Sequence, residues 1–443
     1  MLPSMLRHVN RVHKMCTEIL GRTGGTLDPV KVHHVMSSNF PNFPKEPEFM
    51  KMFDVLGDGI FNSDADLWKN QRKLARVLIN HQRFYRFLVK TSLGKVEMGL
   101  IPILNHVFEQ GLIVDLQDLF QRFTFDTTCI LITCYDPSCP SIEFPDVPFA
   151  KALLMRHVVL ETVWRIQSWL GIGHKKKLSE AWKTLDRVIN KYVSMKKEEM
   201  SKKDELKEGE EAVDLLTSYL IEEDTFNQAP FSKVPLDPLN LKTDPAFNLK
   251  RDDKFLRDTV LNLMLVGRDT TSSALTWFIW LVSQHPIVEE KIIEELKLVI
   301  PEGETEKSQL FEEKELSKLV YLHAALCESL RLYPPVPIQH KEPTQVDTLP
   351  TGHRWNLCGE RIAWSSSQSD GYLTDEQSNM SHLTGPRTCL GKEVAFTQMK
   401  AVSAAIIHNY NVRVVKGHPV VPNASIILYM KHGLKVRVAN RWI

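Results

Sequence analysis

Apolar residues recur at helical spacing along most of the chain. The pattern predicts helices over residues 90–111, 178–200 and 287–300, where apolar side chains return every three or four positions. Strand patterns are short and come late, at 410–415, 425–430 and 434–439. The sequence therefore predicts a mainly α fold with small β-sheets.

Two polar stretches interrupt this pattern. Residues 195–213 are dense in Lys and Glu and indicate a solvated helix end followed by a loop. Residues 228–250 are aperiodic and rich in proline, which is typical of a surface connection. Because no repeat or clear boundary is found, residues 1–443 are interpreted as one domain.

Composition narrows the class of protein. Hydrophobic residues make up 43% and charged residues 25% of the 443 residues, as in a globular protein with a large core. The net charge of +1 gives no support to a nucleic-acid partner. No segment has the roughly 20 apolar residues that span a bilayer, and residues 1–20 alternate basic and apolar positions unlike a signal peptide. The seven cysteines show no disulfide framework, so we expect reduced thiols in an intracellular setting.

One cysteine stands in a specific context. Cys389 is bracketed by Gly385 and Gly391 in GPRTCLGKEVAF, and the pattern after Gly391 predicts a long helix. Glycines permit tight turns and let a flat cofactor approach the backbone. A thiolate at a helix N-terminus is stabilised by the helix dipole and the N–H groups there. A buried structural cysteine is the ordinary alternative, but the G-x-R-x-C-x-G spacing favours an anionic metal ligand.

A second motif lies in a helical segment. Asp269 and Thr270 follow Gly267 and interrupt an otherwise apolar run. The alternative is a solvent-facing turn of the helix, but apolar residues flank the motif on several faces and indicate burial. An acid beside a hydroxyl in a dry pocket can pass protons.

Two further pairs share helix faces. Glu328 and Arg331 are spaced i, i+3, which places opposite charges together, and the following Leu-Tyr-Pro-Pro ends the helix. Trp68 and Arg72 are spaced i, i+4 and combine an amphipathic ring with a group suited to carboxylates. Taken alone, the first is an ordinary surface ion pair and the second is unremarkable.

In this order and spacing the four motifs resemble the cytochrome P-450 superfamily of haem-thiolate monooxygenases. Stretches such as LGDGIFNSDADLWKNQRK and LVGRDTTSSALTWF resemble its plant alkane and fatty-acid hydroxylase branch, with the mid-chain alkane hydroxylases most similar. The resemblance runs from about Met1 to the C-terminus, with gaps. The residues that match the family motifs are Trp68, Arg72, Gly267, Asp269, Thr270, Glu328, Arg331, Gly385, Arg387, Cys389 and Gly391.

The resemblance implies a cytochrome P-450 fold and a haem b cofactor. Cys389 is then the thiolate ligand of the iron and the metal-binding residue. Arg387, Arg72 and the Trp68 indole N–H are expected to bind the haem propionates. The chain carries no dinucleotide fingerprint, so electrons from NADPH are expected through a separate cytochrome reductase.

The resemblance also implies the remaining roles. Thr270 is expected to bind dioxygen and Asp269 to help deliver protons, while Glu328 and Arg331 are structural. The expected product is a hydroxylated long-chain alkane or fatty acid, made at the endoplasmic reticulum membrane surface. The family begins with a hydrophobic membrane anchor, which we expect this chain to lack.

The chain departs from the family in several places, so we expect the fold to be incomplete. A strand pair is missing after GRTGGTL, a piece is missing after FAKAL, and an apolar strand is missing after TLPTGHR. His382 also replaces the Phe that opens the haem loop. A bulky apolar residue at that position shields the thiolate, and histidine does not do this.

Residues 355–384 are polar and aperiodic where the family has W-G and then P-E-R-W. A shifted reading of the codons from Arg354 onward permits both motifs in family order, and Trp355 followed by Asn356 forces a Glu in that reading. The family frame resumes at Gly385. We therefore interpret residues 355–384 as a frame-shifted segment.

Three hypotheses follow. The first is a haem-dependent monooxygenase that hydroxylates long alkyl chains with O2. The second is a non-catalytic product of a damaged or mis-predicted gene of this family. The third is a helical interaction protein that needs neither pigment nor Cys389.

Overall fold

The computed structural model describes most of the chain. The described residues are 29–45, 50, 53–141, 174–202, 214–220, 249–300, 311–337, 339, 341–350, 352, 354–355, 385–423 and 426–442. The expectations for residues 1–20 and for the gap after FAKAL lie outside them. So do those for most of the proline-rich stretch, for His382, and for almost all of the 355–384 segment.

Contacts divide the chain into two compact units. Unit 1 comprises Met1–Met52, Val96–Gln121 and Asp269–Ile443, and unit 2 comprises Phe53–Lys95 and Arg122–Arg268. Two long helices, α7 (Leu116–Thr133) and α14 (Asp253–Gln284), contribute residues to both. The interpretation of residues 1–443 as one domain stays a prediction.

Unit 1 holds the sheets. A three-stranded antiparallel sheet has the order β1-β5-β4, and a second sheet pairs β2 with β3. In the first sheet Val412 lies opposite Val438, and Val114 and Val414 both pair with Val436. The strands are β1 (Val114–Asp115), β2 (Asp347–Thr348), β3 (Arg354–Trp355), β4 (Tyr410–Val414) and β5 (Lys435–Asn440).

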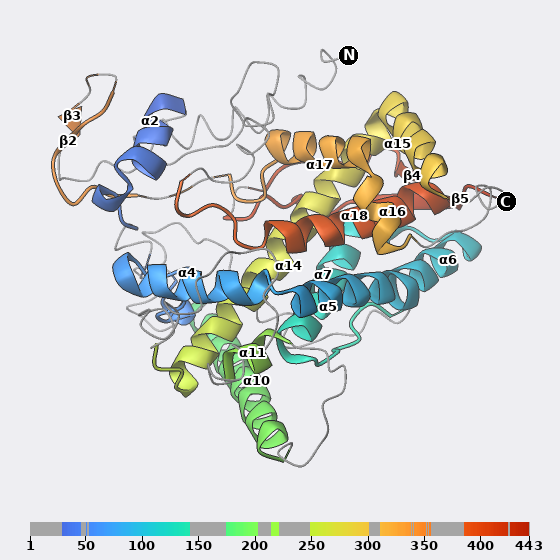
Figure 1. The fold of residues 1–443 in the computed structure, drawn as a ribbon. Coiled ribbons are helices and arrows are strands. Elements are labelled where there is room, and N and C mark those ends of the chain that lie inside the picture. The colour runs from blue at the N-terminus through green and yellow to red at the C-terminus, as the bar shows by residue number, and fades with distance from the viewer. Residues whose placement is uncertain are drawn as a thin grey trace. The chain divides into compact units, whose positions relative to one another are not determined.

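Three helices of unit 1 pack side by side, and a buried aromatic pair joins α14 to the end of α17. In Figure 1, α15, α17 and α18 lie beside one another, and contacts between each pair agree. Trp277 of α14 stacks on Tyr333, with ring centroids 4.2 Å apart and planes 10° apart. The helices are α2 (Pro29–His33), α6 (Ile101–Glu109), α15 (Pro286–Val299), α16 (Glu313–Lys318), α17 (Val320–Leu332) and α18 (Lys392–Asn409), with π-helical turns at His34–Ser38 and Val96–Leu100 and a 3-10 turn at Phe40–Asn42.

The described part of unit 2 is helical. Its elements are a 3-10 turn at Asp54–Leu56, α4 (Ala65–Ile79), α5 (Gln82–Lys95), α10 (His174–Lys202), α11 (Leu215–Leu220) and the unit 2 portions of α7 and α14. Asn262, which is fully buried, ties α14 to the chain before α4 because its Nδ2 donates to the carbonyl of Leu56 at 2.9 Å. Any larger residue at position 59 must displace this amide, since a Cβ there would lie 2.1 Å from Asn262 Nδ2.

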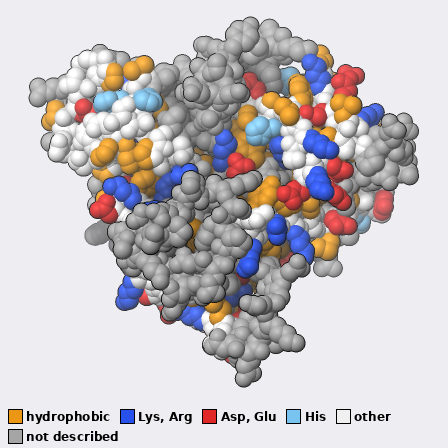
Figure 2. Space-filling model, viewed as in Figure 1, with side chains coloured by type: hydrophobic (Ala, Val, Ile, Leu, Met, Phe, Trp, Pro, Cys, Tyr) orange, Lys and Arg blue, Asp and Glu red, His pale blue; other side chains and the backbone are white. Residues whose placement is uncertain are grey.

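The helical pattern of the sequence is confirmed where the structure describes it. Residues 178–200 fall in α10, residues 287–300 match α15 to within one residue, and residues 90–111 form consecutive α, π and α segments. The charged run begins as the end of α10 and then leaves the described residues. On the face drawn in Figure 2, acidic and basic side chains are interspersed, in agreement with the net charge of +1.

One predicted strand is wrong. Residues 410–415 and 434–439 correspond to β4 and β5, but residues 426–430 form no strand. The backbone there bonds to other partners: the Leu428 N–H donates to Pro335, and the Leu428 carbonyl accepts from Ser273 and Trp277 of α14. Met430 forms an isolated antiparallel bridge with Pro422, and the Tyr429 carbonyl accepts from the Asn423 N–H, but a loop and two side chains bond to the Leu428 backbone, so the run does not extend into a strand.

Substitutions at this carbonyl test the core of unit 1. The Leu428 oxygen accepts from Trp277 Nε1 at 2.6 Å and from Ser273 Oγ at 2.7 Å. We expect Trp277→Phe to lower the free energy of unfolding by about 1–3 kcal/mol, because it removes one bond and part of the stack. Ser273→Ala should cost less, since it opens little space.

The double variant should cost more than the sum of the two, because the buried carbonyl then loses both donors. Urea unfolding of all four proteins measures the coupling. Strict additivity would show that the shared carbonyl is unimportant.

Candidate functional site

The loop before α18 presents Cys389. The side chain is exposed and lies two residues before Gly391, the N-cap residue of α18. The first N–H groups of a helix and its dipole favour a thiolate at this place. Among the described residues other than its two neighbours in the chain, none has a heavy atom within 4 Å of where a Cβ on Gly391 would be, so these residues leave space open beside Gly391.

The start of the same loop is packed tightly. Gly385 has φ +82°, and a Cβ there would lie 1.9 Å from the Met36 carbonyl oxygen. Only glycine combines this backbone conformation with so close an approach. The loop is therefore fixed on one side by Met36 and open beside Gly391.

Met36 is itself held in place. It belongs to a buried cluster with Val32, Val35, Phe43 and Leu349. Asp347 binds the same segment, since its Oδ2 lies 2.7 Å from His34 Nε2 and accepts from Asn39 Nδ2 at 3.0 Å. Burial raises the pKa of the Asp347 carboxyl, but the hydrogen bonds from His34 and Asn39 outweigh burial and hold that pKa below its ordinary value.

Two cations surround one aromatic ring beside this loop. The Arg387 guanidinium carbon lies 5.9 Å, and Lys341 Nζ 4.8 Å, from the centre of the Phe40 ring. Lys341 is only 1% exposed and donates to the Phe43 carbonyl at 2.8 Å. Arg387 was a candidate from its motif. Lys341 was missed, because nothing in its polar sequence surroundings indicates burial.

Glu328 and Arg331 form the ion pair that their spacing allows. Arg331 Nε and Nη2 donate to the two carboxylate oxygens of Glu328, each at 2.7 Å. The Arg331 side chain is 18% exposed and the Glu328 side chain 26% exposed. The pair is therefore half-buried and is not an exposed surface ion pair.

The helix that carries this pair begins on a carboxylate from another helix. Both oxygens of Glu295 in α15 accept from the N–H groups of residues 320, 321 and 322, at 2.8, 2.6 and 2.8 Å. These are the first N–H groups of α17, which have no partner within their own helix. Glu295 was missed, because a contact between residues 25 or more positions apart leaves no local pattern.

Asp269 and Thr270 lie within α14, which runs through the motif without a break. Asp269 is 7% exposed and Thr270 is half-buried, so the expected burial of the acid is confirmed. The Ser272 hydroxyl donates to the Asp269 carbonyl at 3.1 Å.

Trp68 and Arg72 belong to α4 in unit 2. Trp68 is 4% exposed, and the Arg72 guanidinium carbon lies 5.8 Å from its ring centre. The i, i+4 spacing thus brings the two side chains into a cation–π contact. Their roles at a cofactor stay predictions.

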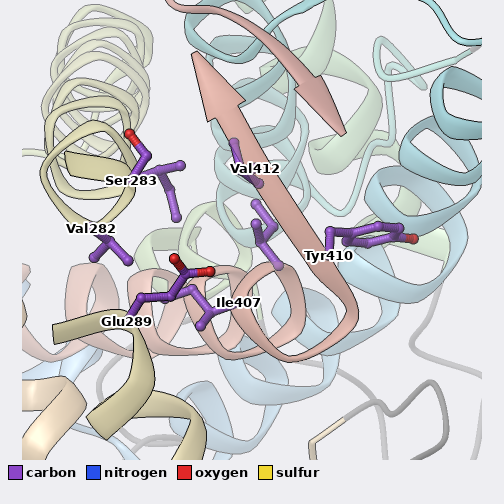
Figure 3. Close-up of a pocket in the computed structure, with 8 residues that line it drawn as sticks. Val282, Ser283, Glu289, Ile407, Tyr410 and Val412 are labelled. Carbon is purple, nitrogen blue, oxygen red and sulfur yellow. The ribbon is translucent and has the colours of Figure 1, made fainter. Parts of the chain in front are cut away.

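The pocket drawn in Figure 3 is a different place. It lies in unit 1, between the end of α14, the start of α15, the end of α18 and β4. Its lining is mostly apolar, and its one carboxylate, Glu289, is bonded to Arg441 at 2.6 Å. None of the candidate site residues lines it.

The described residues contain no group of three His, Cys, Asp or Glu side chains that could hold a metal ion, and a haem iron held by a single cysteine needs none. None of the helices among them is long and apolar enough to cross a membrane.

Comparisons with known proteins agree with these motifs. The family model described as Cytochrome P450 matches residues 25–350. An alkane hydroxylase of Arabidopsis thaliana, MAH1, is 39% identical over 489 aligned positions, which cover 100% of this chain and 92% of that protein. Noroxomaritidine synthase of Narcissus aff. pseudonarcissus MK-2014 is 35% identical over 94% of this chain and 82% of its own length.

A solved structure gives the fold. The cytochrome P450DA heme domain superposes with a TM-score of 0.72 over 94% of this chain and 87% of its own, at 17% sequence identity. The chain belongs to the cytochrome P450 family, the haem-thiolate monooxygenases, and has their mainly helical fold. The family and the fold imply haem as the cofactor.

The residues of unit 1 fit a haem ligand loop. Cys389 is exposed at a helix N-terminus, space is open beside Gly391, and Gly385 anchors the loop on Met36. Arg387 stands on the same loop as the cysteine. These features leave the thiol accessible to a flat cofactor while the backbone behind it is fixed.

Gly385 offers a direct test of this fit. We expect Gly385→Ala to lower haem bound per chain, because a Cβ 1.9 Å from the Met36 oxygen must displace the loop. Gly417→Ala is the matched control, since Gly417 has φ +79° but no atom of another described residue within 4 Å of its Cβ position. It should cost about 1 kcal/mol of stability through backbone strain alone and leave haem binding unchanged.

Haem content by absorbance, against protein concentration, measures both variants. Equal haem loss in the two would mean that strain, and not the contact with Met36, is responsible.

Proposed function

We propose that this chain hydroxylates long-chain alkanes or fatty acids, using O2 and electrons that an NADPH–cytochrome reductase supplies. The observation that carries the proposal is the 39% identity to an alkane hydroxylase over the whole chain. The sequence identity to noroxomaritidine synthase is lower, at 35%, and the match covers less of the chain. We therefore give the substrate of that enzyme less weight than a long-chain alkane or fatty acid. We place the reaction at the endoplasmic reticulum membrane surface, as the resemblance implies.

In this proposal Cys389 is the ligand of the haem iron. Trp68, Arg72 and Arg387 bind the propionates, since an indole N–H and guanidinium groups suit carboxylates. When bound, haem with a thiolate ligand supplies the dioxygen chemistry. Glu328 and Arg331 keep α17 in one arrangement through their two-fold hydrogen bond.

In the same proposal Asp269 and Thr270 deliver protons to the reaction. A buried carboxyl and a half-buried hydroxyl on consecutive residues can hold a proton at Asp269 Oδ and pass it through Thr270 Oγ1. Burial keeps bulk water from supplying protons at random. The apolar flanks of α14, including the buried Met264, Ala274 and Leu275, provide that seclusion.

The haem ligand is tested by substitution. We expect Cys389→Ala to abolish the thiolate-type absorption band of the reduced, carbon-monoxide-bound protein. Cys327→Ala is the control, because Cys327 is a half-buried residue of α17 whose sulfur lies 3.7 Å from His323 Nε2. It should keep the band.

With reductase and NADPH, the parent chain should convert a long-chain n-alkane or fatty acid to alcohols detectable by mass spectrometry. A band that survives Cys389→Ala would refute the ligand assignment. A haem-loaded, reducible protein that leaves both substrate classes unchanged would refute the substrate class.

A second candidate is a non-catalytic product of a damaged gene. Two observations favour it: the family match ends at residue 350, and the alignment to the alkane hydroxylase spans 489 positions against the chain's 443 residues. The relative thus has segments without a counterpart here, and the family pattern stops just before the polar stretch that we interpret as frame-shifted.

Restoring the family frame distinguishes the candidates. We expect a chain in which residues 355–384 are re-read in the shifted frame to bind more haem than the chain as written. The reason is that a polar run repays little of the backbone ordering cost, about 1–2 kcal/mol per residue. Haem per chain is measured for both. Equal loading would show that the segment is a tolerated loop.

A further inference from the structure

Helix α14 meets α7 immediately before the acid–hydroxyl pair. A Cβ on Gly267 would lie 2.7 Å from Thr128 Oγ1 and 2.9 Å from its Cγ2, so glycine is needed for this approach. The next residue, Arg268, is 2% exposed, and its guanidinium carbon lies 5.7 Å from the ring centre of Phe125 in α7. Both contacts lie within unit 2.

Thr124 adds a hydrogen bond at the same crossing. It is fully buried, and its Oγ1 donates to the Arg268 carbonyl at 2.9 Å across 144 residues of sequence. Thr124 and Thr128 are one turn apart, so both point at α14 from one face of α7. A hydroxyl from α7 thus contacts the backbone of the residue directly before Asp269.

The hydrogen bond from Thr124 affects the backbone hydrogen bonds within α14. In an α-helix the carbonyl of residue 268 is the acceptor for the N–H of residue 272. A second donor to such a carbonyl tilts it outward and weakens the ladder bond, as side chains inserted at helix kinks do. The following carbonyl, of Asp269, also receives a hydroxyl, from Ser272. Two successive carbonyls at the motif therefore carry extra donors.

We propose that Thr124 is a positioning residue for Asp269 and Thr270: its hydroxyl holds the Arg268 carbonyl and so sets the local geometry of α14 at the pair. The proposal rests on the proposed proton role of that pair. Thr124 acts through its hydrogen bond to the α14 backbone.

Thr127 provides a matched control on the same helix. It is also fully buried, but its hydroxyl donates to the carbonyls of Phe123 and Thr124 within α7, at 3.0 and 3.2 Å. Thr124→Val and Thr127→Val each replace one hydroxyl by a methyl group of similar size. Thr124→Ser keeps the donor and tests rescue.

Hydrogen–deuterium exchange of a peptide containing Ser272 reports directly on the hydrogen bond from the Ser272 N–H to the Arg268 carbonyl, and it needs no haem. In Thr124→Val we expect exchange there to slow by about 2- to 10-fold, because the competing donor is gone and one hydrogen bond has about this effect. Thr127→Val and Thr124→Ser should match the parent chain. Faster or unchanged exchange in Thr124→Val would overturn the proposal, since simple loss of packing speeds exchange.

The effect on the acid–hydroxyl pair is measured by how tightly NADPH use is coupled to hydroxylation. In Thr124→Val we expect product per NADPH to fall about tenfold with peroxide released in its place, below the roughly 10²-fold that a 1 Å misplacement can cost. The carbon-monoxide band should stay unchanged. Unchanged coupling, or equal losses in Thr127→Val, would overturn the positioning role. If the parent chain shows no thiolate band, the proposed function fails, while the exchange experiment still decides whether Thr124 acts on α14.

Discussion

The contact between Gly385 and the Met36 carbonyl constrains the whole cysteine loop. A Cβ would lie 1.9 Å from that oxygen, so the loop can follow this path only with glycine at its start. The contacts that hold the Met36 segment therefore also fix the Cys389 loop. These contacts are the apolar cluster around Phe43 and the bonds from Asp347 to His34 and Asn39. The position of Cys389 thus depends on a segment some 350 residues earlier in the chain.

Much of the helical fold was predictable, because its signals are local. Apolar periodicity predicts α10, α15 and the stretch from α5 to α6, the pattern after Gly391 predicts α18, and the end of α17 follows from the Leu-Tyr-Pro-Pro that comes after Arg331. The strand expected at 425–430 was wrong for a non-local reason. An apolar, β-branched run makes a strand only when another strand accepts it, and the Leu428 backbone is taken by Pro335, Ser273 and Trp277.

The residues of the candidate site also fall into those that local spacing predicts and those that depend on distant contacts. Spacing alone placed Glu328 against Arg331 and Trp68 against Arg72, since residues three or four apart share a helix face. Lys341, Glu295 and Thr124 were beyond sequence reasoning, because each acts on backbone carbonyls or N–H groups of a distant segment. A side chain that bonds to backbone leaves no complementary residue type for a pattern to reveal.

Glu295 has a consequence for the start of α17. The residue before α17 is Leu319, whose side chain cannot cap a helix, and the carboxylate of Glu295 does that work from α15. The first N–H groups of α17 are therefore satisfied from outside the stretch of chain that leads into the helix. Loss of the Glu295 carboxylate would accordingly free three N–H groups at the start of the helix that carries the Glu328–Arg331 pair.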